Sequence, residues 1–177
     1  MIRQAVREDI PSIAAIYDAV LREEEDGKAT IGWARGVYPT EQTALDALEK
    51  GTLFVCEDAD AEGNSRVVAA AKIDQTQVPE YADCRWEHQV PDDQVMVLHT
   101  LVVDPVGPRR GYGTAFVKFY EEYALSHGCR YLRMDTNERN VIARKLYAKL
   151  GYKEPGIVSC VFNGIPNVRL VCLEKKL

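Results

Sequence analysis

Residues 95–114 read VMVLHTLVVDPVGPRRGYGT, and the expected fold is built around this stretch. Its first part, Val95 to Val103, is an apolar and β-branched run, which is typical of a buried strand. Two prolines and a glycine then end the strand, at Pro105, Gly107 and Pro108. Apolar side chains at helical spacing follow at once, at Ala115, Phe116, Phe119, Tyr120 and Tyr123. The stretch therefore predicts a strand, a turn and a helix in direct succession.

The turn in this unit has the properties of an anion site. Gly111 and Gly113 lack a Cβ, so a ligand can approach their backbone closely. A helix that begins here directs unpaired N–H groups and the positive end of its dipole at the turn. Arg109 and Arg110 add positive charge at the same place. We expect the turn to hold the phosphates of a cofactor; a plain strand-to-helix turn is the alternative that the local sequence leaves open.

The spacing excludes two common phosphate-binding loops. A nucleoside-triphosphate loop has Gly-Lys-Ser/Thr after a first glycine and four intervening residues, and this turn lacks that sequence. A dinucleotide-binding loop needs a third glycine at the position that Phe116 occupies here.

The composition is that of an ordinary globular chain of 177 residues, with 46% hydrophobic and 28% charged residues. We expect a single domain over residues 1–177 with a sizeable core. The net charge of −5 disfavours a general nucleic-acid partner and is compatible with a cationic amine substrate.

The cysteines indicate neither a disulfide framework nor a metal site. They are odd in number and scattered, and they form no Cys-x-x-Cys pair or Cys/His cluster: Cys56, Cys84, Cys129, Cys160 and Cys172. The first residues lack an apolar signal region, and no run approaches the length of a membrane-spanning helix. Together these features predict a cytoplasmic protein with reduced thiols and no membrane partner.

The rest of the chain adds strands and helices around the central unit. We expect further strands at residues 2–6, 52–57, 66–74, 130–134, 152–162 and 168–174, and further helices at about residues 9–26, 40–50 and 138–150. Residues 135–137 are expected to turn into the last helix, and Asn163-Gly164 is a hairpin signal. This order predicts an α/β protein of the α+β type: a mixed, mostly antiparallel seven-stranded sheet with helices on both faces.

Two irregular segments, residues 30–39 and 75–93, contain large aromatic side chains. Such residues in loops either pack beneath the loop or form the wall of a binding site. The residues concerned are Trp33, Tyr38, Tyr81 and Trp86.

Two motifs about 30 residues apart give the chain its resemblance to a known family. The first is LVVDP at residues 101–105, followed by RGYGT at residues 110–114. The second is NVIARKLYAKLGY at residues 140–152. Together they closely resemble the pyrophosphate-binding motif and the Asn-x-x-Ala-x-x-Leu-Tyr-x-x-Leu-Gly-Tyr helix of the GNAT superfamily of acetyl-CoA-dependent N-acetyltransferases. The resemblance covers nearly the whole chain, since the expected order of elements also fits the GNAT fold.

One part of the first motif departs from the family pattern. Pro108 stands where the family usually has Arg or Gln, and Arg109 stands where a Gly usually follows. Because Pro108 has no N–H to offer a phosphate, one cofactor contact differs from the family's.

The resemblance implies how acetyl-CoA is bound. The strand that ends at Val103 would part from its neighbour, and the pantetheine arm would pair with backbone groups near Leu101 and Val103 as an added strand does. The pyrophosphate would meet the N–H groups of residues 109–114 and the helix dipole. The full set of implied cofactor residues is Leu101, Val102, Val103, Arg109, Arg110, Gly111, Tyr112, Gly113, Thr114, Asn140, Ala143 and Tyr147.

The resemblance also implies direct attack of an amine on the thioester. Tyr147 stands where the family places the acid that protonates the leaving thiolate. His99 is a candidate for the base, and strand alternation predicts that it faces the same side as Leu101 and Val103. Asp135 and Glu87 are weaker candidates for the base, and Asp135 could instead bind a cationic substrate. For both Tyr147 and His99, a purely structural role in the core is the alternative.

We expect the acceptor to be a primary amine of a small molecule or a peptide, with Trp33, Tyr38, Tyr81, Trp86 and Asp135 around it. Two other functions stay open: a non-catalytic acyl-CoA-binding regulator, and a protein N-terminal acetyltransferase with an open peptide groove. Similar proteins are often dimers, so the resemblance also allows a homodimer.

Overall fold

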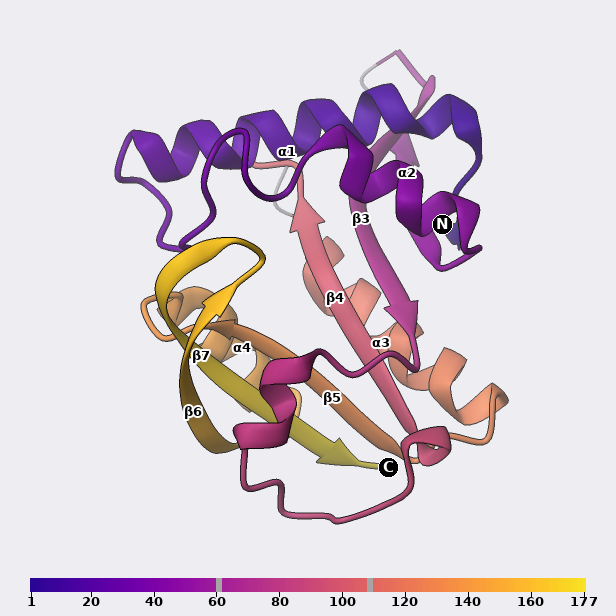
Figure 1. Cartoon of the computed structure of the whole chain (residues 1–177). Helices are drawn as coiled ribbons and strands as arrows, with labels where there is room; N and C mark the ends of the chain where they lie inside the picture. Colours follow the sequence, from indigo (N-terminus) through magenta and orange to yellow (C-terminus); the bar gives the residue numbers. More distant parts are fainter. Residues whose placement is uncertain (60–61, 108–109) are drawn as a thin grey trace.

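A seven-stranded sheet in the order β1-β2-β3-β4-β5-β7-β6 forms the centre of the molecule (Figure 1). The computed structural model describes residues 1–59, 62–107 and 110–177. All neighbouring strands are antiparallel except β4 and β5, which run parallel. The strands are β1 (Ile2–Gln4), β2 (Leu53–Ala59), β3 (Ser65–Asp74), β4 (Val95–Val103), β5 (Tyr131–Asn137), β6 (Lys153–Phe162) and β7 (Ile165–Lys176). The predicted mixed, mostly antiparallel sheet is confirmed.

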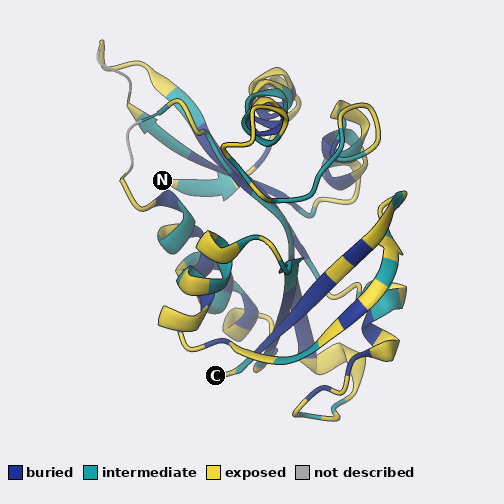
Figure 2. Cartoon of the chain, turned by 90° about the vertical axis from the view of Figure 1, so that its left-hand side faces the viewer, coloured by how far each residue is buried: buried dark blue, intermediate teal, exposed yellow. Residues whose placement is uncertain are grey.

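Helices cover both faces of this sheet, as expected. On one face α1 (Ile10–Glu25) and α2 (Glu41–Glu49) enclose an apolar cluster with β2 and β3. On the other face α3 (Tyr112–Ser126) and α4 (Val141–Lys149) enclose a second cluster. The sides of the helices that face the sheet are buried and their outer sides are exposed, which is the pattern of amphipathic helices (Figure 2). Within the described residues, no helix combines the length and apolar character needed to cross a membrane.

A third apolar cluster lies beside β6 and β7 and contains the segment that connects β3 to β4. This segment includes the short 3₁₀ turns η2 (Pro79–Asp83) and η3 (Asp92–Gln94), and a further 3₁₀ turn, η1 (Arg7–Asp9), precedes α1. Residues 75–93 were expected to be irregular, and apart from these short 3₁₀ turns that expectation is confirmed.

Strand β5 is longer than the sequence indicates. Residues 135–137 were expected to form a turn, but they continue the strand to Asn137. They pair with β7, in the register Asp135↔Cys172, Thr136↔Val171 and Asn137↔Leu170. The turn prediction was wrong because pairing with a strand far along the chain overrides the local preference for a turn.

The parallel pair β4 and β5 separates half-way along its length. The β4–β5 pairing runs from Val95↔Tyr131 to Leu98↔Met134 and ends there, although both strands continue. Figure 1 shows the two strands beginning side by side and diverging towards their carboxyl ends. Beyond Leu98, the edge of β4 that faces β5 therefore makes no ladder with it, as the family resemblance implied.

A β-bulge in β4 accompanies this separation. The pairs Lys72↔His99 and Ala70↔Val102 leave Thr100 and Leu101 opposite one residue of β3, and Thr100 has a φ of 53°. Strict alternation predicts His99 on the face of Leu101 and Val103, and the bulge makes that prediction wrong. Leu101 and Val103 pack against the α3/α4 cluster together with Leu98, whereas His99 faces the opposite side.

Candidate active site

A cavity of about 590 Å³ lies where β4 and β5 part. It is lined by residues from β4, β5 and α4, and also by the α1–α2 connection and the β6–β7 hairpin. The residues expected from the sequence that line it are Trp33, Tyr38, His99, Leu101, Val103, Gly113, Asp135, Asn140, Ala143 and Tyr147. The structure thus brings together side chains from distant parts of the chain.

Other predicted residues lie outside this lining. Val102 is buried against the α1/α2 cluster, on the far face of β4. Tyr81 and Trp86 pack edge to face in the third apolar cluster, with ring centroids 4.9 Å apart. Glu87 is exposed and pairs with Lys153, 2.9 Å away.

The start of α3 is an open helix N-terminus. Gly111 occupies the N-cap with a φ of 75°, and no side chain of the described residues caps the helix. Arg110 and Tyr112 both bind the carboxylate of Asp58, and Thr114 belongs to the first turn. Pro108 and Arg109, which the sequence placed in this turn, lie outside the described residues.

Gly113 lies where α3 approaches both β4 and α4. A Cβ on this residue would contact Leu146 at 3.5 Å and Val103 at 3.8 Å, so it would point into the channel between these elements. The open N–H groups and this channel fit a diphosphate that carries a long, slender arm.

Asn140 and Tyr147 occupy the two ends of α4. Asn140 caps the helix: its Oδ1 accepts the N–H of Ala143 at 3.2 Å, and its Nδ2 donates to Thr136 at 3.2 Å. Tyr147 is buried in the α3/α4 cluster and lines the cavity. Burial, with a smaller contribution from the charge of Asp135, raises the pKa of Tyr147, so its hydroxyl keeps its proton at neutral pH.

A second group of side chains faces the cavity from the other side of the sheet. His99 is held by β3 and the residues after it: its Nε2 lies 3.1 Å from the carbonyl oxygen of Thr76 and 3.3 Å from Oδ1 of Asp74. Thr100, the bulged residue, is hydrogen-bonded to the hydroxyl of Tyr38. Nothing in the sequence signals Thr100 or Asp74, because a bulge with a β-branched residue at positive φ is contrary to local preference.

Asp135 is a carboxylate at the cavity wall without a cationic partner among the described lysines and arginines. One of its oxygens accepts the hydroxyl of Tyr81 at 2.7 Å. Burial raises the pKa of Asp135, although the Tyr81 hydrogen bond and nearby His99 act in the opposite direction. A half-buried carboxylate of this kind favours a cationic ligand, which would restore its charge balance.

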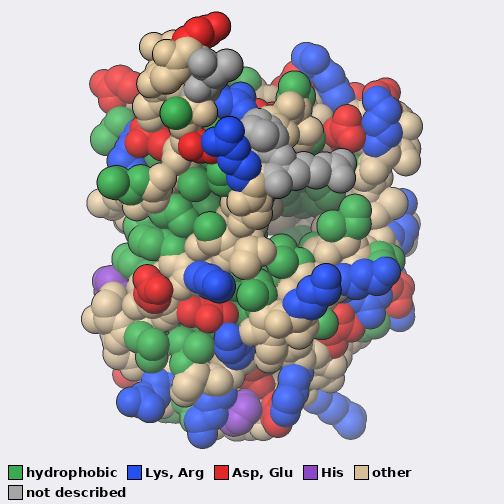
Figure 3. Space-filling model, turned by 180° about the vertical axis from the view of Figure 1, so that it is seen from behind, with side chains coloured by type: hydrophobic (Ala, Val, Ile, Leu, Met, Phe, Trp, Pro, Cys, Tyr) green, Lys and Arg blue, Asp and Glu red, His purple; other side chains and the backbone are tan. Residues whose placement is uncertain are grey.

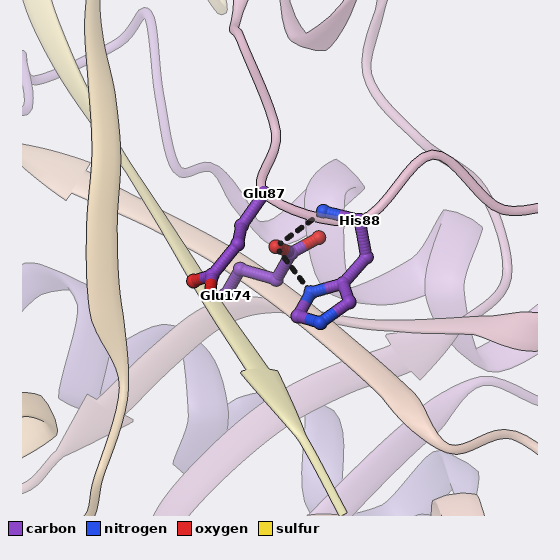
Figure 4. A group of neighbouring side chains, drawn as sticks. All are labelled: Glu87, His88 and Glu174. Carbon is purple, nitrogen blue, oxygen red and sulfur yellow. Dashed lines mark hydrogen bonds and ion pairs between the residues drawn. The ribbon is translucent and has the colours of Figure 1, made fainter.

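A buried ion pair fixes the segment that supplies Tyr81. Arg133 contacts Glu174 at 3.1 Å, donates to the carbonyl of His88 at 2.7 Å and stacks on Trp86, 4.1 Å from the ring centroid. Glu174 also accepts the backbone N–H and binds the ring Nδ1 of His88 (Figure 4). Glu87, His88 and Glu174 could together approach a metal ion, but Arg133 and Lys153 already neutralise the two carboxylates. Glu87, His88 and Glu174 are therefore explained as residues that anchor the segment between β3 and β4.

The comparison with known proteins identifies the family. Residues 15–152 match the model of the acetyltransferase (GNAT) family. The chain belongs to this family. Its members use acetyl-CoA as the acetyl donor.

Individual relatives of this GNAT protein are distant. An uncharacterized N-acetyltransferase of Methanocaldococcus jannaschii is 33% identical over 76 residues, which are 43% of this chain and 34% of that protein. The match therefore spans about a third of that relative's length. A GNAT-family acetyltransferase of Streptococcus agalactiae has the same fold with a TM-score of 0.78 and 22% identity, over 100% of this chain and 95% of the other. The yncA protein of Salmonella typhimurium, solved with its cofactor acetyl-CoA, matches with a TM-score of 0.70 and 15% identity, over 100% and 93% of the two chains.

Replacing Gly113 with alanine should weaken acetyl-CoA binding about tenfold, because the new methyl group enters the channel between β4 and α4. The fold should tolerate the change, since the methyl meets only ordinary contacts and alanine is the better helix former. Isothermal titration calorimetry with acetyl-CoA measures the first effect, and thermal unfolding serves as the control. Unchanged affinity would remove Gly113 from the cofactor path.

Replacing Asp135 with asparagine should stabilise the protein at neutral pH. The pKa of Asp135 is raised in the folded state, so the native protein loses stability as the pH rises from below the ordinary value of 3.8 through the raised value. Asparagine carries no charge and escapes that loss, while it can still accept the Tyr81 hydroxyl. Urea unfolding at about pH 7 and about pH 4 should show a gain that shrinks at the lower pH.

The matched control is Asp18→Asn on the surface of α1. The hydrogen bond from Arg35 lowers the pKa of Asp18, so its replacement should bring no gain at neutral pH. A destabilised Asp135→Asn variant at neutral pH would contradict the account of Asp135 as a half-buried charge without a cationic partner among the described lysines and arginines.

Proposed function

We propose that this protein transfers the acetyl group of acetyl-CoA to a primary amine of a small molecule. The observation that carries the proposal is the cavity at the β4–β5 separation, which touches side chains on both faces of the sheet. Tyr147 reaches it from the α4 side, and His99 and Asp135 reach it from the opposite side. A donor on one face and an acceptor on the other would therefore meet at the gap between the strands.

Acetyl-CoA supplies an acetyl group that is activated as a thioester. The chain would hold it with the backbone groups of Leu101 and Val103, which β5 leaves unpaired, and with the N–H groups at the start of α3. Seen from the α3/α4 side, basic and acidic side chains are interspersed with apolar ones (Figure 3). Binding of acetyl-CoA on this side would thus depend on nearby backbone N–H groups rather than on a large surface area of positive potential.

His99 and Asp135 would prepare the amine. An amine attacks only after it has lost its proton, and a histidine can accept that proton near neutral pH. Asp135 would attract the amine in its ammonium form, because the carboxylate lies at the cavity wall and, within the part of the chain that the structure describes, its hydrogen-bond partner is the neutral hydroxyl of Tyr81. His99 would then take the proton, either directly or through a water molecule.

Tyr147 would return a proton to the leaving sulfur. Its hydroxyl is protonated at neutral pH and makes no hydrogen bond to any described residue, so it is available as a donor. A general acid at this point makes the thiolate a better leaving group.

The walls of the cavity favour a small acceptor over a peptide. The α1–α2 connection lies directly on the end of β5: Thr30 donates to the carbonyl of Arg139 at 2.8 Å, and a Cβ on Gly32 would overlap Asn137. The hairpin tip contacts the same connection, since a Cβ on Gly164 would lie 3.3 Å from Val37. A peptide chain would have to displace these packed segments, whereas a small amine fits within about 590 Å³.

A thiol-release assay with acetyl-CoA tests the proposal across primary amines, amino acids, polyamines, aminoglycosides and N-terminal peptides. Turnover of one or more small amines is the expected result. Preferred turnover of peptides would favour the N-terminal acetyltransferase alternative. Tight acetyl-CoA binding without turnover of any acceptor would favour the regulatory alternative.

Replacing Tyr147 with phenylalanine should lower kcat for the best acceptor by on the order of 10². The Michaelis constant for acetyl-CoA should change little, because the ring and its packing against Tyr152 are kept. Steady-state thiol release measures both constants, and Tyr152→Phe, which also removes one buried hydroxyl, is the matched control. An unchanged kcat in the Tyr147 variant would show that another group protonates the sulfur.

A further inference from the structure

The imidazole of His99 is held in one tautomer by its neighbours. Its Nε2 lies 3.1 Å from the carbonyl oxygen of Thr76, and a carbonyl can only accept a hydrogen bond. Oδ1 of Asp74 is a second acceptor 3.3 Å from the same nitrogen. Nε2 must therefore carry the proton, which leaves Nδ1 of the neutral ring with its lone pair.

Asp74 is itself fixed from two sides. Its Oδ1 also accepts the backbone N–H of Thr76 at 2.8 Å, and its Oδ2 pairs with Nζ of Lys72 at 3.0 Å. Burial opposes ionisation, but the hydrogen bonds from His99 and Thr76 outweigh it and lower the pKa of Asp74. Asp74 is thus a rigid anion beside the ring, and its side chain is only 13% exposed.

We propose that Asp74 is a positioning residue for the acetyl transfer, which holds His99 with Nδ1 as the nitrogen that takes the proton of the acceptor amine. This inference rests on the proposed function, in which His99 is the base. The proton moves from the ammonium of the acceptor to Nδ1, and the positive ring that results keeps both of its Nε2 acceptors. The anion of Asp74, 3.3 Å from Nε2, attracts the positive ring that forms during the transfer.

Among the described residues, the charged groups around His99 are Lys72 and Asp74 from β3 and Asp135 from β5. Lys72 disfavours a charged ring and Asp135 favours it, so their effects oppose each other. Asp74 differs from both because it also contacts the ring nitrogen and sets its orientation. The Asp74→Asn substitution removes the negative charge but keeps an oxygen that can accept a hydrogen bond from His99. It therefore tests the electrostatic effect of Asp74 separately from its effect on folding.

The experiment compares Asp74→Asn, Asp74→Glu and His99→Gln with the wild-type protein and with Asp18→Asn as a surface control. With acetyl-CoA and the best small amine, Asp74→Asn should lower kcat roughly tenfold, and His99→Gln should lower it by on the order of 10². The Michaelis constant for acetyl-CoA should stay the same. In Asp74→Asn the acidic limb of the pH profile of kcat/KM should move to lower pH, because a charged ring is less stable without its anion.

Asp74→Glu should recover part of the lost rate, because it restores the carboxylate, and Asp18→Asn should behave like the wild type. A kcat and pH profile in Asp74→Asn equal to those of the wild type, in a variant that unfolds cooperatively, would refute the role of Asp74. A purely structural role would lower the yield of folded protein without moving the acidic limb.

A second measurement is independent of turnover. Nitrogen-15 NMR of the three histidine rings, assigned with His99→Gln, should show His99 protonated at Nε2 in the neutral form. A ring protonated at Nδ1 would refute the proposal even if the enzyme is active. Conversely, a protein that turns over no acceptor refutes the proposed function, while the NMR result still decides the tautomer.

Discussion

The end of the β4–β5 ladder at Leu98 and Met134 is the constraint on which the rest of the site depends. Backbone N–H and C=O groups in the interior need partners, so a strand edge that separates from its neighbour inside a sheet is costly unless something else pairs with it. Here the separated edge borders a cavity rather than solid core. A ligand that presents its own donors and acceptors can complete the ladder, which is how an extended arm is recognised by added-strand pairing.

The bulge at Thr100 has a second effect on the same strand. The bulge adds one residue to β4, so the side chains after it point to the opposite face from the one that strict alternation predicts. His99 and Leu101 therefore lie on opposite sides of the sheet. Thr100 at positive φ is a local strain, and its hydrogen bond to Tyr38 from the α1–α2 connection helps to hold it. Strain of this kind persists only where surrounding contacts fix it. The bulge keeps Leu101 on the α3/α4 face, where Tyr147 lies, while His99 is on the other face.

The far side of the gap concentrates polar groups that do not serve the stability of the core. Asp135 is half-buried, its described hydrogen-bond partner is the neutral hydroxyl of Tyr81, and desolvation raises its pKa. Tyr38 is similarly affected, because burial raises its pKa to about 12. The Arg133–Glu174 ion pair and the stacked Trp86 fix the segment after β3 at a site away from the cavity. This segment supplies Tyr81, which binds Asp135, and Thr76, which binds His99. The stable Arg133–Glu174 anchor thus supports the electrostatically unfavourable position of Asp135 at the cavity wall.

The sequence by itself determined the order of the elements, the sheet with helices on both faces, the open helix start at Gly111 and the place of Tyr147 on α4. These features follow from the hydrophobic periodicity, from the glycines and prolines that end helices and strands, and from two local motifs. All of these signals act over a few residues. Only the tertiary structure decided that β5 continues to Asn137, that His99 faces away from Leu101, and that Tyr81 and Trp86 lie in the core rather than on the cavity wall. It alone also brought Asp74 to His99 and Tyr81 to Asp135. The reason is that strand length, register and bulges are set by pairing between segments far apart in the chain, and one added residue moves every following side chain to the other face.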